Sequence, residues 1–231
     1  MGKPRCRILV FAKAPEPGKV KTRLVPALGE GGAARLYERL VLRALSAACE
    51  AALGPVELWC APDAAHAFFV ECARRHKVTL RTQGEGDLGA RMDQALRSAL
   101  RHSEHALLIG SDIPELTPAY LREADRALAD ADVVLGPAQD GGYMLIGLKR
   151  PAPGLFQGLS WGESSVLAAT LERIDRAGLR CRRLSSLRDV DRPEDLAGLP
   201  GRLRAAGGRH LQRRPRSAID STLHQARRRR S

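Results

Sequence analysis

The sequence predicts an α/β protein, a three-layer α/β/α sandwich in which helices cover both faces of a mostly parallel sheet. Short apolar runs alternate along the chain with longer segments in which apolar residues recur every three to four positions. This alternation is typical of strands joined by right-handed helical crossovers. The runs at 133–136 and 143–148 lie too close together for a helix between them. We therefore expect an antiparallel pair, which makes the sheet mixed.

The strand-like runs are rich in β-branched and other apolar residues and end at glycine, proline or charged residues. They lie at residues 8–12, 56–61, 78–82, 106–110, 133–136, 143–148 and 179–184. Helical periodicity predicts helices at residues 31–52, 64–76, 88–101, 118–129 and 164–177. In the first of these, Leu36, Leu40, Ala44 and Ala48 form one apolar face, and Gly54-Pro55 ends the helix.

Length and charge divide the chain into one domain at 1–200 and a tail at 201–231. The chain has 231 residues, 44% of them hydrophobic, which is enough for a large core. Its net charge is +12, but the tail alone has ten arginines, no lysine and one acid. The tail has few large apolar residues, so we expect it to be disordered. It also lacks aromatic residues for base stacking, which argues against nucleic acid as the main partner.

The cysteines and the hydropathy pattern indicate a cytoplasmic protein. Five cysteines form no CxxC pair and mostly lie in apolar runs, as reduced core thiols do. No apolar run approaches the roughly 18 residues of a membrane span. The apolar run before Lys13 is too short for a signal peptide.

A basic loop, KAPEPGKVKTRL, follows the first strand. It carries Lys13, Lys19, Lys21 and Arg23 against one acid, Glu16. Ligands of open α/β sheets bind at the carboxyl ends of the strands, so phosphate is a candidate ligand of these cations. By charge alone, a solvated basic loop is equally compatible with the pattern.

Carboxylates follow later strands. Asp112, in LIGSDIP, comes directly after an apolar strand, where it could bind Mg²⁺ or Mn²⁺ that bridges phosphate oxygens. A turn or cap aspartate is the alternative. Asp140, in DGGY, could be a second carboxylate near the metal or a base for an acceptor hydroxyl, and the alternative there is a hairpin turn.

The segment DVDRPEDL places alternate aspartates, Asp189 and Asp191, on one face of an expected strand end. Asp191 could complete a metal site with Asp112. An N-capping aspartate followed by acids in the first helical turn is the alternative, and it fits Glu194 and Asp195. The spacing of Gly84, Gly86 and Gly89 imitates a dinucleotide fingerprint, but its strand is polar and Asp87 would repel a pyrophosphate.

With these motifs in order, the chain resembles a bacterial family of nucleotide-diphospho-sugar-transferase-like proteins of unknown function (DUF2064), some of them described as glycosyltransferases of arsenosugar biosynthesis. The resemblance covers about residues 6–197 and rests on five ordered motifs: FAKAPEPGKVKTRL, QGEGDLGARM, LIGSDIP, GPAQDGGYMLIGL and DVDRPEDL. KTRL is also similar to the nucleotide loop of phospholactate guanylyltransferases. The DVDRPEDL ending is similar to that of CTP-dependent sugar-acid and molybdenum-cofactor nucleotidyltransferases.

The resemblance implies a GT-A-like, Rossmann-like fold and a role for each motif. Asp112 and Asp191 would bind the metal, Mg²⁺ or Mn²⁺. The nucleotide would contact Ala12, Lys13, Gly18, Lys21, Thr22, Arg23, Gln83, Gly86, Asp87, Leu88, Arg91 and Ser111. The acceptor side would comprise Gly141, Gly142, Tyr143, Trp161 and Glu163, with Asp140, Lys21 and Arg23 as catalytic residues. The family usually has threonine where Glu163 and Arg192 stand here, which could alter the choice of acceptor.

These observations predict a metal-dependent glycosyltransferase that uses a nucleotide sugar and a small-molecule acceptor. A nucleotidyltransferase that releases pyrophosphate is the alternative, because the same cations and metal would serve both reactions. A non-catalytic nucleic-acid binder acting through the tail and an NAD-dependent dehydrogenase are further alternatives. The nucleotide, the acceptor and the oligomeric state are not predicted.

Overall fold

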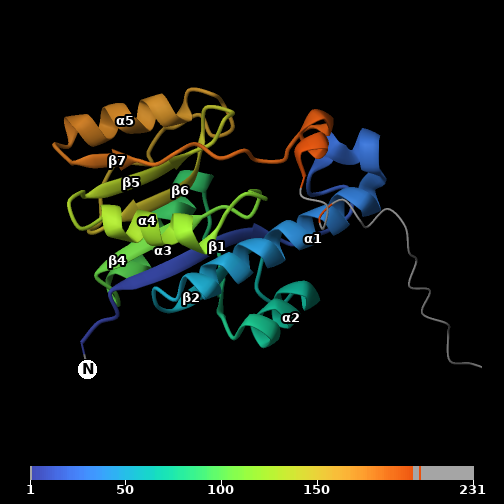
Figure 1. Cartoon of the computed structure of the whole chain (residues 1–231), viewed down its shortest axis with the longest axis horizontal. Helices are drawn as coiled ribbons and strands as arrows, with labels where there is room; N and C mark the ends of the chain where they lie inside the picture. The colour runs from blue at the N-terminus through green and yellow to red at the C-terminus, as the bar shows by residue number, and fades with distance from the viewer. Residues whose placement is uncertain (1, 200–202, 204–231) are drawn as a thin grey trace, which may run out of the picture.

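The computed structural model describes residues 2–199 and residue 203, which form a seven-stranded sheet between two layers of helices (Figure 1). The strands are β1 (Cys6–Lys13), β2 (Val56–Ala61), β3 (Thr79–Thr82), β4 (His105–Ile109), β5 (Val133–Pro137), β6 (Tyr143–Leu148) and β7 (Cys181–Arg183). Their order across the sheet is β3-β2-β1-β4-β6-β5-β7. Strand β6 is antiparallel to both β4 and β5, and the other pairs are parallel. The predicted mixed, mostly parallel sheet is therefore confirmed.

The helices cover the two faces of the sheet. They are α1 (Val25–Ala51), α2 (Ala67–His76), α3 (Leu88–Leu100), α4 (Pro118–Ala127) and α5 (Val166–Arg176), with short 3-10 helices η1 (Thr22–Leu24) and η2 (Pro193–Gly198). Helices α1, α2 and α4 share one buried cluster with the sheet, and α3 and α5 share the other. The three-layer arrangement follows from this division.

Strand β1, which lies between β2 and β4, shows how the sequence divides the two cores. Ile8, Val10 and Ala12 belong to the cluster with α1, whereas Leu9 and Phe11 belong to the cluster with α3. This is the two-residue alternation of a strand that is covered on both faces. Residues 8–12 of β1 are therefore buried, and Lys13 at its carboxyl end is exposed.

The segment before η2 leaves the sheet. Asp189 and Asp191 were expected on a strand end, but that expectation is wrong: this segment makes one bridge, between Leu187 and Ala138, and residues 188–199 form no strand. The backbone N–H of Val190 then donates to the Asp112 carbonyl at 3.2 Å. A small apolar cluster, which contains Leu24, Leu36, Leu40, Val190, Leu199 and Leu203, holds the segment against α1.

Element bounds agree closely with the periodicity, with one clear difference. Helix α1 begins at Val25 rather than at residue 31, and Gly29 interrupts it with a φ of 68°. Glycine can adopt a positive φ at no steric cost because it has no Cβ, so the helix can continue after a kink at Gly29.

No helix in the described part of the chain is long and apolar enough to cross a membrane. The expected disordered tail lies outside the described residues, apart from Leu203.

Candidate functional site

Two adjoining cavities open at the carboxyl ends of β1 and β4. One, of about 530 Å³, is lined by every cation of the first loop and is called the cationic cavity below. The other, of about 390 Å³, is lined by four aspartates and Glu163 and is called the acidic cavity. Six residues line both: Phe11, Arg23, Leu88, Gly110, Asp112 and Asp191. The cavities therefore meet at the two carboxylates expected to bind a metal.

Lys21 lies at this junction. Its backbone is left-handed (φ 49°), which turns the loop into η1 and points the side chain inward. The ammonium lies 3.1 Å from Asp112 Oδ2 and 3.8 Å from Asp191 Oδ1, and the side chain is only 5% exposed. An ammonium buried between two carboxylates has lost most of its hydration, so the ion pairs hold it in place. This placement distinguishes Lys21 from an ordinary solvated lysine.

The other loop cations are more exposed. Arg23 donates to Asp191 Oδ2 at 2.5 Å with a side chain that is 62% exposed. Lys19 pairs with Glu16 and is 74% exposed. Lys13 is exposed at the end of β1. These cations line the cationic cavity without being buried in it, and exposed pairs of this kind contribute little to stability.

Asp112 follows β4, and its two carboxylate oxygens have different surroundings. Oδ2 faces Lys21, whereas Oδ1 is buried and accepts no hydrogen bond from the described residues. Two aspartate side chains facing one point suit Mg²⁺ or Mn²⁺, whose remaining ligands are often phosphate oxygens and water. The described residues contain no cluster of three or more His, Cys, Asp or Glu side chains with metal-binding geometry. The donor set therefore fits a cation shared with a phosphate rather than one held by protein alone.

Tyr37, which the sequence placed only in a helix, supports this junction. Its hydroxyl accepts a hydrogen bond from the Lys13 backbone N–H at 2.9 Å and lies 3.1 Å from Ser111 Oγ. It therefore ties α1 to the ends of β1 and β4. Burial, and second the nearby Asp112 carboxylate, raise the pKa of the Tyr37 hydroxyl above its ordinary value. The hydroxyl thus remains protonated and able to donate.

Gln83 and Arg91 complete the cationic cavity. The Gln83 amide donates to the carbonyls of Ala12 and Trp59 at 3.2 and 2.9 Å, which joins the ends of β1 and β2. Its oxygen accepts from Arg91 Nη1 at 3.3 Å. Gln83 therefore orients Arg91 toward the cavity that both residues line.

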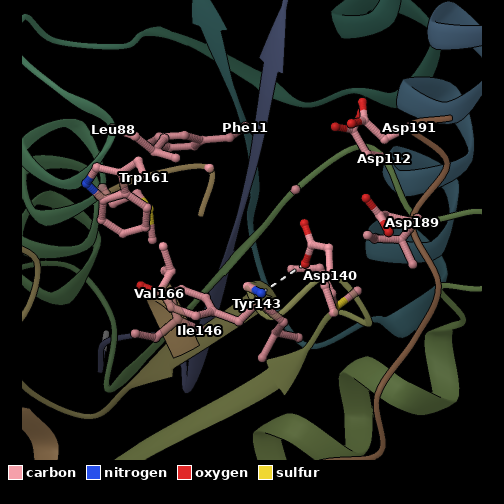
Figure 2. A pocket seen from close by; sticks show the side chains of 18 of the residues that line it. Phe11, Leu88, Asp112, Asp140, Tyr143, Ile146, Trp161, Val166, Asp189 and Asp191 are labelled. Atoms are coloured by element: carbon pink, nitrogen blue, oxygen red, sulfur yellow. Dashed lines mark hydrogen bonds between the residues drawn. The ribbon is translucent and has the colours of Figure 1, made fainter. Parts of the chain in front are cut away.

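Asp140 and Asp189 lie on one side of the acidic cavity (Figure 2). Asp140 Oδ1 accepts the Gly142 backbone N–H at 2.9 Å, which leaves Oδ2 without that partner. Burial, and second the neighbouring Asp140 carboxylate, raise the pKa of Asp189 above its ordinary value. The DGG segment is thus both the turn between β5 and β6 and a wall of the cavity. Sequence reasoning noted Asp189 but assigned it no role.

Aromatic and aliphatic side chains form the opposite wall, where Phe11, Leu88, Tyr143 and Trp161 face the aspartates (Figure 2). The rings of Tyr143 and Trp161 meet edge to face, with centroids 6.2 Å apart. Trp161 fits here because Gly89 has no side chain: a Cβ there would lie 3.0 Å from the indole and 2.5 Å from the Phe156 carbonyl oxygen. Sequence reasoning placed Phe11 only in a strand and did not expect it at a site.

Most of the expected site residues line one of the two cavities, but four do not: Gly18, Gly86, Asp87 and Gly141. Asp87 instead caps α3, where its Oδ1 accepts the Ala90 N–H at 2.8 Å. The three glycines have positive φ values. At Gly141 a Cβ would also lie 2.3 Å from the Ser164 carbonyl oxygen. These residues shape the loops around the cavities.

Comparison with known proteins agrees with this architecture. The fold is that of nucleotide-diphospho-sugar transferases. A Desulfovibrio desulfuricans G20 structure, provisionally described as such a transferase, is 35% identical to the chain, with a TM-score of 0.74. The match covers 81% of this chain and 82% of that one. The chain belongs to the family described as "Uncharacterized protein conserved in bacteria (DUF2064)", whose profile matches residues 44–163. The family resemblance is therefore confirmed.

More distant structures share the fold alone. Glucosyl-3-phosphoglycerate synthase from Mycobacterium tuberculosis, solved with Mn²⁺, UDP and glucosyl-3-phosphoglycerate, is 12% identical with a TM-score of 0.54, over 85% of this chain and 75% of that one. The 4-diphosphocytidyl-2C-methyl-D-erythritol synthase of Anaerococcus prevotii DSM 20548 is 11% identical with a TM-score of 0.58, over 87% and 98%. No curated protein matches the chain. The first of these proteins is named for a glucosyl compound and the second for a cytidyl compound, so the fold alone does not distinguish the two kinds of product.

Proposed function

We propose that this protein is a metal-dependent glycosyltransferase that moves a sugar from a nucleotide-sugar donor to a small-molecule acceptor. The observation that carries the proposal is the pair of adjoining cavities of opposite charge, which meet at Lys21, Asp112 and Asp191. A transferase needs a place for the anionic donor and a separate place for the acceptor, with the reacting atoms between them.

The donor diphosphate would lie in the cationic cavity. Lys21, Arg23 and Arg91 line it, and together they can balance the charge that develops on the leaving diphosphate. Ion pairs to Asp112 and Asp191 place the Lys21 and Arg23 side chains at the border of the cavity proposed for the diphosphate. These residues would therefore act on the transition state as well as on the bound donor.

Mg²⁺ or Mn²⁺ would be held by Asp112 and Asp191, together with phosphate oxygens. When bound, the cation would neutralise part of the charge of the leaving diphosphate. The unpartnered Asp112 Oδ1 and the convergence of the two carboxylates support this assignment. The same fold is found in glucosyl-3-phosphoglycerate synthase, which was solved with Mn²⁺ and UDP.

Asp140 would act as the base for the acceptor. Its Oδ1 is held by the Gly142 N–H, so Oδ2 is available to take the proton of an acceptor hydroxyl. The deprotonated oxygen forms a bond to the anomeric carbon of the sugar, and the bond from that carbon to the diphosphate oxygen breaks. The electron pair of the broken bond leaves with the nucleoside diphosphate.

The released product tests the proposal. The full chain, with Mg²⁺ or Mn²⁺, is incubated with a panel of nucleotide sugars or nucleoside triphosphates and a pool of hydroxylated acceptors. Glycosyl transfer releases a nucleoside diphosphate and needs the cation, so EDTA abolishes it. Release of pyrophosphate from a triphosphate would instead identify the alternative, a nucleotidyltransferase. Neither product, together with no nucleotide-induced thermal shift, would exclude both reactions.

A further inference from the structure

The acidic cavity carries charge that the residues described by the structure do not balance. Among the described residues, its lining has five carboxylates and one cation, Arg23, which is paired with Asp191. Lys21 balances Asp112 from the other cavity. Asp140, Glu163 and Asp189 form no ion pair with any residue that the structure describes. A molecule that enters this cavity therefore meets three carboxylates that have no cationic partner among these residues.

The opposite wall offers flat apolar surface. Phe11, Tyr143 and Trp161 face the aspartates across the cavity, and Leu88 and Val166 lie beside them (Figure 2). Aromatic rings bind apolar faces by contact and attract cations to their faces. A wall of rings opposite a wall of carboxylates is thus complementary to a molecule that has one apolar face and a neutral or positive polar end.

The neighbouring cavity has the opposite preference. Lys13, Lys19, Lys21, Arg23 and Arg91 all line it. A phosphate or carboxylate on the acceptor would be attracted to those cations and repelled by Asp140, Glu163 and Asp189, so it would compete with the donor instead of entering the acidic cavity. The cationic cavity therefore favours the anionic donor, and the acidic cavity favours an acceptor without negative charge.

We infer that the acceptor is an uncharged or cationic compound with an apolar or aromatic face and a hydroxyl group, and that phosphorylated and carboxylated acceptors are excluded. This inference rests on the proposed function, because it assigns the acidic cavity to the acceptor. Glu163 selects against anions by its charge, and Trp161 provides the surface on which the apolar face packs.

Three matched probes test the inference: tyramine, tyrosol and 4-hydroxyphenylacetate. All have a 4-hydroxyphenyl group, and their short side chains end in an ammonium, a hydroxyl and a carboxylate. Their dissociation constants for the full chain are measured by calorimetry or ligand-observed NMR at pH 7.5. We expect tyramine to bind about tenfold more tightly than 4-hydroxyphenylacetate, with tyrosol between them. Higher salt should reduce this difference.

Glu163→Gln should reduce the preference for tyramine over 4-hydroxyphenylacetate from about tenfold to about threefold, because one carboxylate is removed from the cavity. Glu123→Gln is the matched control, since it removes the same charge from an exposed position on α4. The control should leave the preference unchanged. Trp161→Ala should weaken all three probes by a similar factor, because it removes contact surface and no charge.

The outcomes separate this inference from the proposed function. If 4-hydroxyphenylacetate binds as tightly as tyramine, or if none of the three probes binds, the inferred acceptor class is wrong. Equal effects of Glu163→Gln and Glu123→Gln would also contradict it. If the expected order of affinities is found but no nucleotide sugar yields a nucleoside diphosphate, the ligand class of the cavity is supported and glycosyl transfer is not.

Discussion

The cationic and acidic cavities share a border and six lining residues, yet they are assembled in different ways. Most cations of the first cavity come from one continuous loop, residues 13–23, and Arg91 is added from α3. The carboxylates of the second come from four separate segments, around residues 112, 140, 163 and 189–191. The cationic cavity is thus largely a local feature of the sequence. The acidic cavity exists only because the fold brings distant segments together.

Two lysines of the same loop also differ in how deeply their side chains are buried. Lys19 and Lys21 are two residues apart, but Lys19 is 74% exposed and Lys21 is 5% exposed. An exposed ion pair contributes roughly 0–1 kcal/mol, whereas removal of one partner from a buried pair leaves an uncompensated charge. In the described part of the chain, Lys21 is the one loop cation that forms ion pairs with both carboxylates, so the number of basic residues in the loop overstates how many of them act on both.

The largest expected effect concerns the acidic cavity. Asp140→Asn should lower the rate of sugar transfer by about 10²- to 10⁴-fold, because the amide cannot accept the acceptor's proton. Affinity for nucleoside diphosphate should remain unchanged, since Asp140 does not line the cationic cavity. Steady-state kinetics and calorimetry measure the two quantities. Asp130→Asn, at an exposed position, is the charge-matched control. An equal loss of nucleotide affinity would mean that the two cavities do not have separate roles.

A smaller effect is expected for the cationic cavity. Lys21→Met should weaken nucleoside diphosphate binding about 100-fold, because a charge-assisted contact contributes about 1.5–3 kcal/mol. Lys19→Met should weaken it less than about threefold, as expected for an exposed cation. Calorimetry in the presence of Mg²⁺ gives both affinities, and circular dichroism confirms that each variant folds. Similar losses for the two lysines would show that the loop acts only by its total charge.

The smallest effect is expected for Asp87, which belongs to a family motif but lines neither cavity. Asp87→Ala should lower the free energy of unfolding by about 1 kcal/mol through loss of the α3 cap. It should not change nucleotide affinity, because Asp87 lines neither cavity. Urea denaturation and calorimetry measure these quantities. Asp87→Ser keeps a capping oxygen and should restore most of the stability. A marked change in nucleotide affinity would instead show that Asp87 contributes to nucleotide binding, as the family resemblance implied.

The elements were predicted well where the pattern was local. Strands β2 and β6 have the predicted bounds, Val56–Ala61 and Tyr143–Leu148, because apolar runs end there at clear breaks. The start of α1 was missed, since Gly29 interrupts the periodicity while the helix continues. The strand end expected at Asp189 was wrong because residues 184–191 make one isolated bridge, at Leu187, and no ladder. Pairing of that kind depends on a partner far away in the sequence.

The site was predicted in part for the same reason. The motifs identified Asp112, Asp140 and Asp191, which do line the acidic cavity. Tyr37 was missed because a tyrosine on an apolar helix face is indistinguishable from core, and its bonds to Lys13 and Ser111 are long-range. Phe11 was missed because the alternation of a strand does not say which face meets a cavity.

By itself, the sequence determined the α/β class, the positions of most helices and strands, and the basic loop that supplies most cations of one cavity. These features depend on periodicity, on turn residues and on neighbours in the chain. Only the tertiary structure decided the order of the strands, the burial of Lys21 between Asp112 and Asp191, and the gathering of four separate acidic segments in a cavity that aromatic side chains also line. Charge and hydrophobicity are local properties of a sequence, whereas burial and proximity are properties of the packed chain.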